Sequence, residues 1–159
     1  MYNKINRCRS CDDKKLIDIV NLGNQPLANA LLNSTNNVKK EIKVPLKLTI
    51  CKECKLIQLS HTVDPKILFK KYLWVTGTSQ KVKTYRKFFF EKLKKYIKLQ
   101  NNFICEIASN DGFFLEYVKN NNTAVGIDPA KNIAKTANLN GIKTHTDFFN
   151  LSTAKKIIK

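Results

Sequence analysis

The sequence predicts an α/β protein in which a small four-cysteine zinc-binding module precedes about three parallel strands of a truncated Rossmann-like sheet. Three observations predict this fold class. Two C-x-x-C pairs lie in the first 54 residues, a strand–loop–helix–strand pattern occupies 103–128, and a hydrophobic share of 43% permits packed cores. We therefore expect a zinc-binding domain at 1–62, a helical connector at 63–100 and the N-terminal half of the sheet domain at 101–159.

The C-x-x-C pairs consist of Cys8 with Cys11 and Cys51 with Cys54. A two-residue spacer lets both thiolates of a pair turn towards one ion, and two pairs complete a tetrahedral zinc site. Closing the loop of 39 residues between the pairs costs about 3–4 kcal/mol, whereas structural zinc contributes roughly 10–16 kcal/mol in small peptides. No ligand position is left open, so we expect a structural ion. The alternative is two unrelated pairs, and we interpret Cys105 as a small core residue.

Apolar and alternating runs predict the strands of the zinc-binding module. We expect strands at 16–20, 44–50 and 56–59, and the turn-forming residues at 21–26 predict a loop. The last two strands flank the second C-x-x-C pair. That pair is therefore expected at the tip of a hairpin.

Charge is concentrated in the middle of the chain. The net charge is +17, and 63–100 holds 11 basic and 2 acidic residues. Ser79 is a suitable N-cap for a helix whose apolar side chains recur at steps of three and four from Val82 to Tyr96. The lysines mostly occupy the opposite face, so a solvated helix explains the charge. An anionic partner such as nucleic acid, a nucleotide-sugar diphosphate or a membrane surface is the alternative.

The pattern at 103–128 predicts the start of a parallel sheet. Phe103 to Ala108 is an apolar run expected to be a strand buried on both faces. Ser109 to Gly112 form a polar loop, and a helix is expected to begin at Gly112. Thr123 to Ile127 form the next strand, which ends at Asp128. A helix from Pro129, a strand over 142–146 and a helix from Leu151 are expected to follow.

The loop is not one that suits a dinucleotide. Ala108 and Asn110 stand where glycines would be, and Glu106 and Asp111 lie beside them. Two carboxylates repel a pyrophosphate but suit a cationic ligand such as S-adenosylmethionine (SAM), which carries a sulfonium and an ammonium. Asp128 lies 22 positions after Glu106, a spacing that suits an acid on the ribose hydroxyls. The alternative is an α/β domain whose loop binds nothing.

No apolar run approaches the ~20 residues needed to cross a bilayer, and the N-terminus has no apolar signal region. We therefore expect a cytoplasmic protein without a membrane span.

Taken together, these motifs resemble the SAM-dependent C-methyltransferases that act on nucleotide-linked deoxysugars and carry an N-terminal zinc-binding domain. The resemblance rests on segments that run in family order over nearly the whole chain: Cys8–Cys11, Leu22–Asn29, Cys51–Leu59, Tyr72–Ser79, Glu106–Gly112, Gly126–Ala130 and Phe148–Phe149. The family more often shows Tyr where this chain has Trp74.

The resemblance implies a role for each matching residue. Cys8, Cys11, Cys51 and Cys54 would bind zinc. The methionine end of SAM would be lined by Glu106, Ser109, Asn110, Asp111 and Gly112. Asp128 would hold the ribose, and Asp147 and Phe148 would flank the adenine. Gln25, Tyr72 and Ser79 would face a nucleotide-sugar substrate.

The resemblance also implies that part of the enzyme lies elsewhere. The family continues with further strands and a C-terminal domain that holds its acid/base residues, and neither His61 nor His145 matches a family motif. The strand at 103–108 would be left with one open edge. We therefore expect a fragment that is inactive or incomplete alone, with a possible companion chain that supplies the rest. The alternative function is a zinc-ribbon module that binds nucleic acid through a basic helix, but we do not expect a nucleic-acid partner.

Overall fold

The computed structural model describes residues 1–158, with the side chain of Asn36 left out. The chain divides into two compact units, Met1–Leu68 and the residues from Phe69 onward. Helix α1 (Pro65–Phe69) lies at the division. No helix in the described part of the chain combines the length and the apolar character that crossing a bilayer requires.

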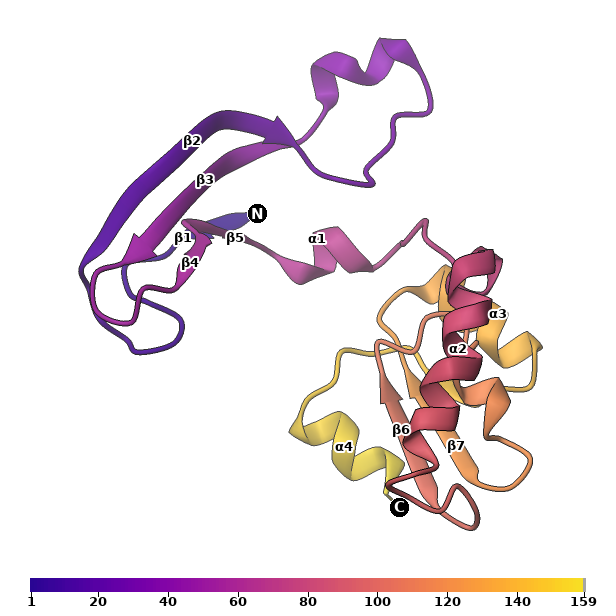
Figure 1. The fold of residues 1–159 in the computed structure, drawn as a ribbon. Coiled ribbons are helices and arrows are strands. Elements are labelled where there is room, and N and C mark those ends of the chain that lie inside the picture. Colours follow the sequence, from indigo (N-terminus) through magenta and orange to yellow (C-terminus); the bar gives the residue numbers. More distant parts are fainter. Residues whose placement is uncertain (159) are drawn as a thin grey trace. The chain divides into compact units, whose positions relative to one another are not determined.

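The first unit is built from two small antiparallel sheets (Figure 1). One pairs β1 (Tyr2–Lys4) with β5 (His61–Val63). The other has the order β2-β3-β4, and its elements are β2 (Leu16–Pro26), β3 (Lys43–Cys51) and β4 (Ile57–Leu59). A 3₁₀ helix, η1 (Thr35–Lys40), lies between β2 and β3. The second C-x-x-C pair therefore sits where β3 turns towards β4, as the sequence predicted.

Strand β2 is longer than the sequence predicted. The expected loop at 21–26 is wrong, because pairing with β3 continues as far as Pro26 opposite Lys43. Register shifts between Asp18 and Val20 and between Asn21 and Asn24 interrupt the ladder, and Gly23 has a positive φ of 70°. Irregularities of this kind place turn-forming residues inside an edge strand without ending it.

The second unit contains the expected parallel sheet. Its order is β6-β7-β8, and both pairings are parallel. The strands are β6 (Phe103–Ile107), β7 (Thr123–Ile127) and β8 (Thr144–His145). The helices are α2 (Gln80–Leu93), α3 (Lys131–Leu139) and α4 (Leu151–Ile157), with 3₁₀ turns η2 (Thr76–Thr78) and η3 (Leu115–Tyr117). The α/β fold class with three parallel strands is therefore confirmed.

The core of the second unit lies where α2 and α3 meet the polypeptide that links β6 to β7. Phe90, Leu115, Val118, Ala137 and Ile142 form a buried cluster. The ring of Phe90 also stacks on Tyr117, with centroids 4.5 Å apart. Helix α2 begins as predicted, because the Ser79 hydroxyl accepts a hydrogen bond from the Val82 N–H at 3.4 Å.

Two expectations about this unit are wrong. The helix expected at Gly112 is only the short turn η3, because Gly112 has a positive φ of 75°, outside the helical region. Strand β6 is not buried on both faces, since Phe103 and Ile107 are half exposed. It lies at the edge of the described sheet, so the open edge implied by the family resemblance is present.

Candidate metal and cofactor sites

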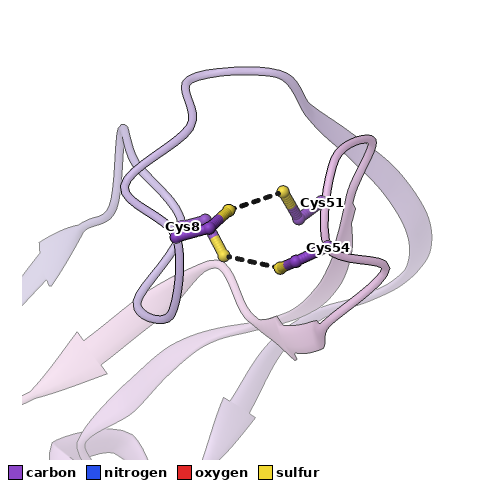
Figure 2. Close-up of side chains that lie close together, drawn as sticks. Cys8, Cys51 and Cys54 are labelled. Atoms are coloured by element: carbon purple, nitrogen blue, oxygen red, sulfur yellow. Dashed lines mark hydrogen bonds between the residues drawn. The ribbon is translucent and has the colours of Figure 1, made fainter.

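The four cysteine sulfurs of the first unit converge on one point. Cys8, Cys11, Cys51 and Cys54 place their sulfurs within 4.8 Å of one another. The closest pairs join the two loops, with Cys8 3.5 Å from Cys54 and Cys11 3.5 Å from Cys51. Figure 2 shows Cys8 facing Cys51 and Cys54 across the gap. Sulfurs about 2.3 Å from a common tetrahedral zinc lie about 3.8 Å apart, so the donor set and its spacing fit one zinc ion.

The thiols strongly influence one another. Backbone N–H groups of Cys11 and Ser10 are the main reason that the pKa of the Cys8 thiol falls to about 6. At Cys11 the backbone N–H of Asp13 lowers the thiol pKa, but the Cys54 sulfur, burial and the sulfurs of Cys51 and Cys8 together outweigh it and raise the pKa to about 12. Four sulfurs at this distance cannot all ionise without a cation. A divalent ion removes that conflict, and the buried Cys8 and Cys51 show that the sulfurs are partly closed to solvent.

A second layer of contacts surrounds Cys8, and the sequence did not predict it. The side-chain N–H of Gln58 donates to the Cys8 sulfur at 3.3 Å, and Gln58 is buried. Its carbonyl oxygen accepts from the backbone N–H of Arg9 at 3.1 Å and from the Arg9 guanidinium at 3.3 Å. In β4 the usual burial is reversed: the apolar Ile57 and Leu59 are exposed, and the polar Gln58 between them is buried. A polar residue between two apolar ones is the only signal of this contact in the sequence.

In the second unit, the loop after β6 has the positive φ angles that are usual for glycine, although two of the three residues concerned are not glycine. Ala108 and Asn110 both adopt positive φ, at 58° and 51°, and Gly112 adopts 75°. Asparagine tolerates this region, whereas alanine is strained there. A Cβ on Gly112 would lie 2.8 Å from Ile142, and one on Gly126 of β7 would lie 2.4 Å from the Ser109 hydroxyl. These glycines let the loop pack directly on the neighbouring strand and on Ile142.

Asp128 braces this loop from the end of β7. One carboxylate oxygen accepts from the Asn110 N–H at 2.9 Å, and the other accepts from the Ala130 N–H at 2.8 Å. Asp128 is buried, with 6% of its surface exposed. The acid and the loop therefore meet at the carboxyl ends of β6 and β7, where ligands bind in open parallel sheets.

Three carboxylates share this end of the sheet. Burial is the main reason that the pKa of Glu106 rises from 4.5 to about 7, and the charges of Asp111 and Asp128 contribute to that rise. One buried oxygen of Glu106 has no hydrogen-bond partner among the described residues, and the same holds for the Ser109 hydroxyl and the His145 Nε2. An additional anion would increase this repulsion, whereas a cation would relieve it.

The chain segment before α2 is fastened to the same loop. The Asn110 amide oxygen accepts from the Thr76 N–H at 2.9 Å, and the Asn110 amide N–H donates to the Trp74 carbonyl at 3.0 Å. The carboxylate of Asp111 accepts from the Gly77 N–H at 3.0 Å. The amide of Asn132 on α3 both donates to the Tyr72 carbonyl, at 2.7 Å, and accepts from the Tyr72 N–H, at 3.2 Å. We call residues Tyr72–Ser79 the strap.

The remaining predicted site residues have separate surroundings. Asp147 and Phe148 follow β8, and the Asp147 carboxylate accepts from the Phe148 N–H at 2.8 Å and from the Thr153 hydroxyl at 3.3 Å. Of the predicted substrate residues, Tyr72 and Ser79 lie in the strap. Gln25 lies on β2 in the first unit, where its side chain donates to the Leu22 carbonyl at 2.5 Å.

Comparison with known proteins agrees with the zinc geometry. Residues 8–69 match a family model described as "Putative zinc binding domain". All four clustered cysteines lie inside the match. Over 155 residues the chain is 30% identical to the C-methyltransferase NovU of Streptomyces niveus, and the alignment covers 96% of this chain. The chain spans 37% of the length of NovU. The resemblance to C-methyltransferases with an N-terminal zinc-binding domain is therefore confirmed over nearly the whole of this chain.

Proposed function

We propose that this chain is the N-terminal part of a SAM-dependent C-methyltransferase that acts on a nucleotide-linked deoxysugar. In this proposal a structural zinc ion organises the first unit, and SAM binds at the carboxyl ends of β6 and β7 in the second. The loop Ser109–Gly112 and Glu106 line the methionine end, Asp128 faces the ribose, and Asp147 and Phe148 flank the adenine. SAM, when bound, supplies an electrophilic methyl group.

The observation that carries the cofactor proposal is the group of carboxylates at this end of the sheet. Burial, together with the charges of Asp111 and Asp128, makes Glu106 costly to ionise and raises its pKa to about 7. The sulfonium and ammonium groups of SAM would relieve that repulsion, whereas a pyrophosphate would add to it. The unpartnered oxygen of Glu106 is free to accept a hydrogen bond from the ligand.

The proposal also covers the methyl acceptor and the base that activates it. Similarity to NovU supports transfer to carbon, and such a transfer requires a base that removes a proton from the acceptor. We propose that this base comes from polypeptide beyond the residues described, either in the same protein or in a companion chain. Tyr72 and Ser79 in the strap and Gln25 in the first unit are proposed to face the sugar.

The cofactor proposal can be tested by calorimetric titration at pH 8 with SAM, S-adenosylhomocysteine, ATP and NAD⁺. We expect SAM and S-adenosylhomocysteine to bind, because both carry the ammonium and the nucleoside. We expect no binding of the two pyrophosphate ligands. The variant Glu106→Gln, which removes one negative charge at nearly constant shape, should weaken SAM by about tenfold.

Two results would count against the proposal. Tighter binding of ATP or NAD⁺ than of SAM would show that the carboxylates do not select the ligand. Binding of duplex DNA or RNA with a steep salt dependence, without any SAM response, would favour the nucleic-acid alternative.

A further inference from the structure

We call the loop Ser109–Gly112 the cofactor loop. The hydrogen bonds that join it to the strap among the described residues involve Asn110 and Asp111. Asn110 contributes both ends of its amide to strap backbone, at Trp74 and Thr76, and Asp111 accepts from Gly77. Asn110 is also 91% buried, so its amide is already surrounded by protein. An amide that both donates to and accepts from one backbone segment fixes that segment's position and orientation.

Asn110 also connects the strap to Asp128. Its backbone N–H donates to the buried Asp128 carboxylate, while its side chain holds the strap. The positive φ of 51° at this residue points the backbone N–H and the side chain to these two partners at once. Gly77 completes the junction, because a Cβ there would lie 2.6 Å from the Asp111 carboxylate and 3.1 Å from the Phe113 ring.

We propose that Asn110 is a positioning residue that locks the strap onto the cofactor loop, with Gly77 as its counterpart on the strap. Its side-chain amide holds the strap, while its backbone remains part of the loop that lines the proposed SAM site. This inference rests on the proposed SAM site. If the strap faces the acceptor, the lock holds the acceptor side and the cofactor side in one arrangement before either ligand arrives. Loosening the strap would also release one hydrogen bond from Asp111, so part of the SAM binding energy would be spent on reordering the loop.

The chain provides its own reporter for this lock. Trp74 is the single tryptophan of the sequence and lies in the strap, half exposed. Its fluorescence anisotropy reports strap mobility, and its emission can be followed during a SAM titration.

The decisive variant is Asn110→Gly. Glycine adopts the same positive φ without strain and keeps the backbone N–H that Asp128 accepts from, so only the two strap hydrogen bonds are lost. We expect lower Trp74 anisotropy in the unliganded variant and about tenfold weaker SAM binding. Gly77→Ala, which displaces the Asp111 carboxylate from the other side, should act in the same direction. Thr84→Ala on the exposed face of α2 is the matched control and should change neither quantity.

The possible outcomes are distinct. Weaker SAM binding together with a more mobile Trp74 in both variants supports the lock. Normal SAM affinity in Asn110→Gly, with or without a change in anisotropy, overturns it and leaves the proposed cofactor site standing. A wild-type chain that does not bind SAM overturns the proposed cofactor site and this inference together. If Asn110→Gly does not fold, as judged by circular dichroism, Gly77→Ala alone decides by the same two measurements.

Discussion

The apolar side chains that the described residues bury gather in the second unit, whereas the first unit buries mainly sulfur and polar groups. In the second unit Leu115, Ile127, Ile133 and Ile142 are each at most 2% exposed. In the first unit Val44 is the buried aliphatic residue among those described, and its companions are Cys8, Cys51, Thr49, Gln58 and Ser60. Two regions of one chain thus reach a fixed structure by different means, apolar burial in one and metal coordination in the other.

This contrast teaches where each unit is vulnerable. A small sheet with little apolar core depends on a disulfide or a bound metal ion for its stability. Its exposed apolar residues, such as Ile17, Ile19 and Leu59, add little stability to the isolated unit. The second unit needs no metal for its core. Conditions that remove zinc should therefore unfold the first unit and leave the second unit folded.

Metal removal is the largest expected effect. A strong chelator, or the variant Cys51→Ser, should unfold the first unit, because structural zinc contributes roughly 10–16 kcal/mol in small domains. Amide hydrogen exchange should show loss of protection in β3 and β4 with protection in β7 unchanged. Cys105→Ser is the control, since Cys105 lies in β6 and should leave the zinc content at one per chain. Equal loss of protection in both units would break the comparison.

The reverse experiment removes core volume from the second unit. Leu115→Ala deletes a side chain that is 2% exposed in the buried cluster, and such changes cost about 2–5 kcal/mol. Urea unfolding followed by Trp74 fluorescence should shift to lower denaturant, while zinc content stays the same. Leu139→Ala at the exposed end of α3 should change stability by less than about 0.5 kcal/mol. Loss of zinc from Leu115→Ala would show that the two units are not independent.

A smaller effect is expected at the contacts around the metal. Gln58→Met removes the N–H that reaches the Cys8 sulfur while keeping the volume of the side chain. Loss of such an outer contact lowers metal affinity by about 10- to 100-fold. Competition with a chromophoric chelator measures this directly. Gln25→Met is the matched control, because the Gln25 amide donates to a backbone carbonyl and not to a sulfur; equal affinities in the two variants would exclude the role of Gln58.

The pH dependence of the second unit should follow Glu106. Its pKa is raised from 4.5 to about 7 in the folded chain, first by burial and then by Asp111 and Asp128. Below pH 4.5 Glu106 holds its proton in both states, so its contribution to stability is greatest there. Between pH 4.5 and about 7 only the unfolded chain releases that proton. Stability therefore falls across that window by up to about 2 kcal/mol, allowing for partial exposure, and is level above it.

The variant Glu106→Gln should flatten that slope, measured as urea midpoints at pH 5 and pH 8 with Trp74 as the probe. Zinc loss at low pH does not enter, because Trp74 lies in the second unit. An unchanged slope in the variant would assign the pH dependence to other groups.

The sequence predicted the features that have a local cause and missed those that depend on how strands pair. The spacing of the cysteines, the alternating run at 44–50 and the cap at Ser79 are local signals, and the structure contains the cysteine cluster, the strand β3 and the cap. Burial within β3 does not follow the alternation, because Thr49 is buried. The end of β2 and the inward face of Gln58 depend on how one strand pairs with another, which no short window reveals. The strap contacts are further removed, because the bonds from Thr76 and Gly77 reach residues 34 positions away.

The smallest effect on stability is expected from replacing Ala108 with glycine. A glycine there would adopt the φ of 58° without the strain that a Cβ causes, although it would also make the unfolded chain more flexible. The two effects oppose each other. Strain in the folded state disfavours alanine by about 1–2 kcal/mol, and flexibility of the unfolded chain disfavours glycine by about 0.4–1 kcal/mol. Ala108→Gly should therefore stabilise the second unit by up to about 1.6 kcal/mol in urea unfolding. Ala124→Gly in β7, a control with ordinary strand geometry, should destabilise it. If Ala108→Gly destabilises as much as the control, the loop holds no strain at this residue, and its backbone shape has to be attributed to the hydrogen bonds of Asn110 and Asp128 alone.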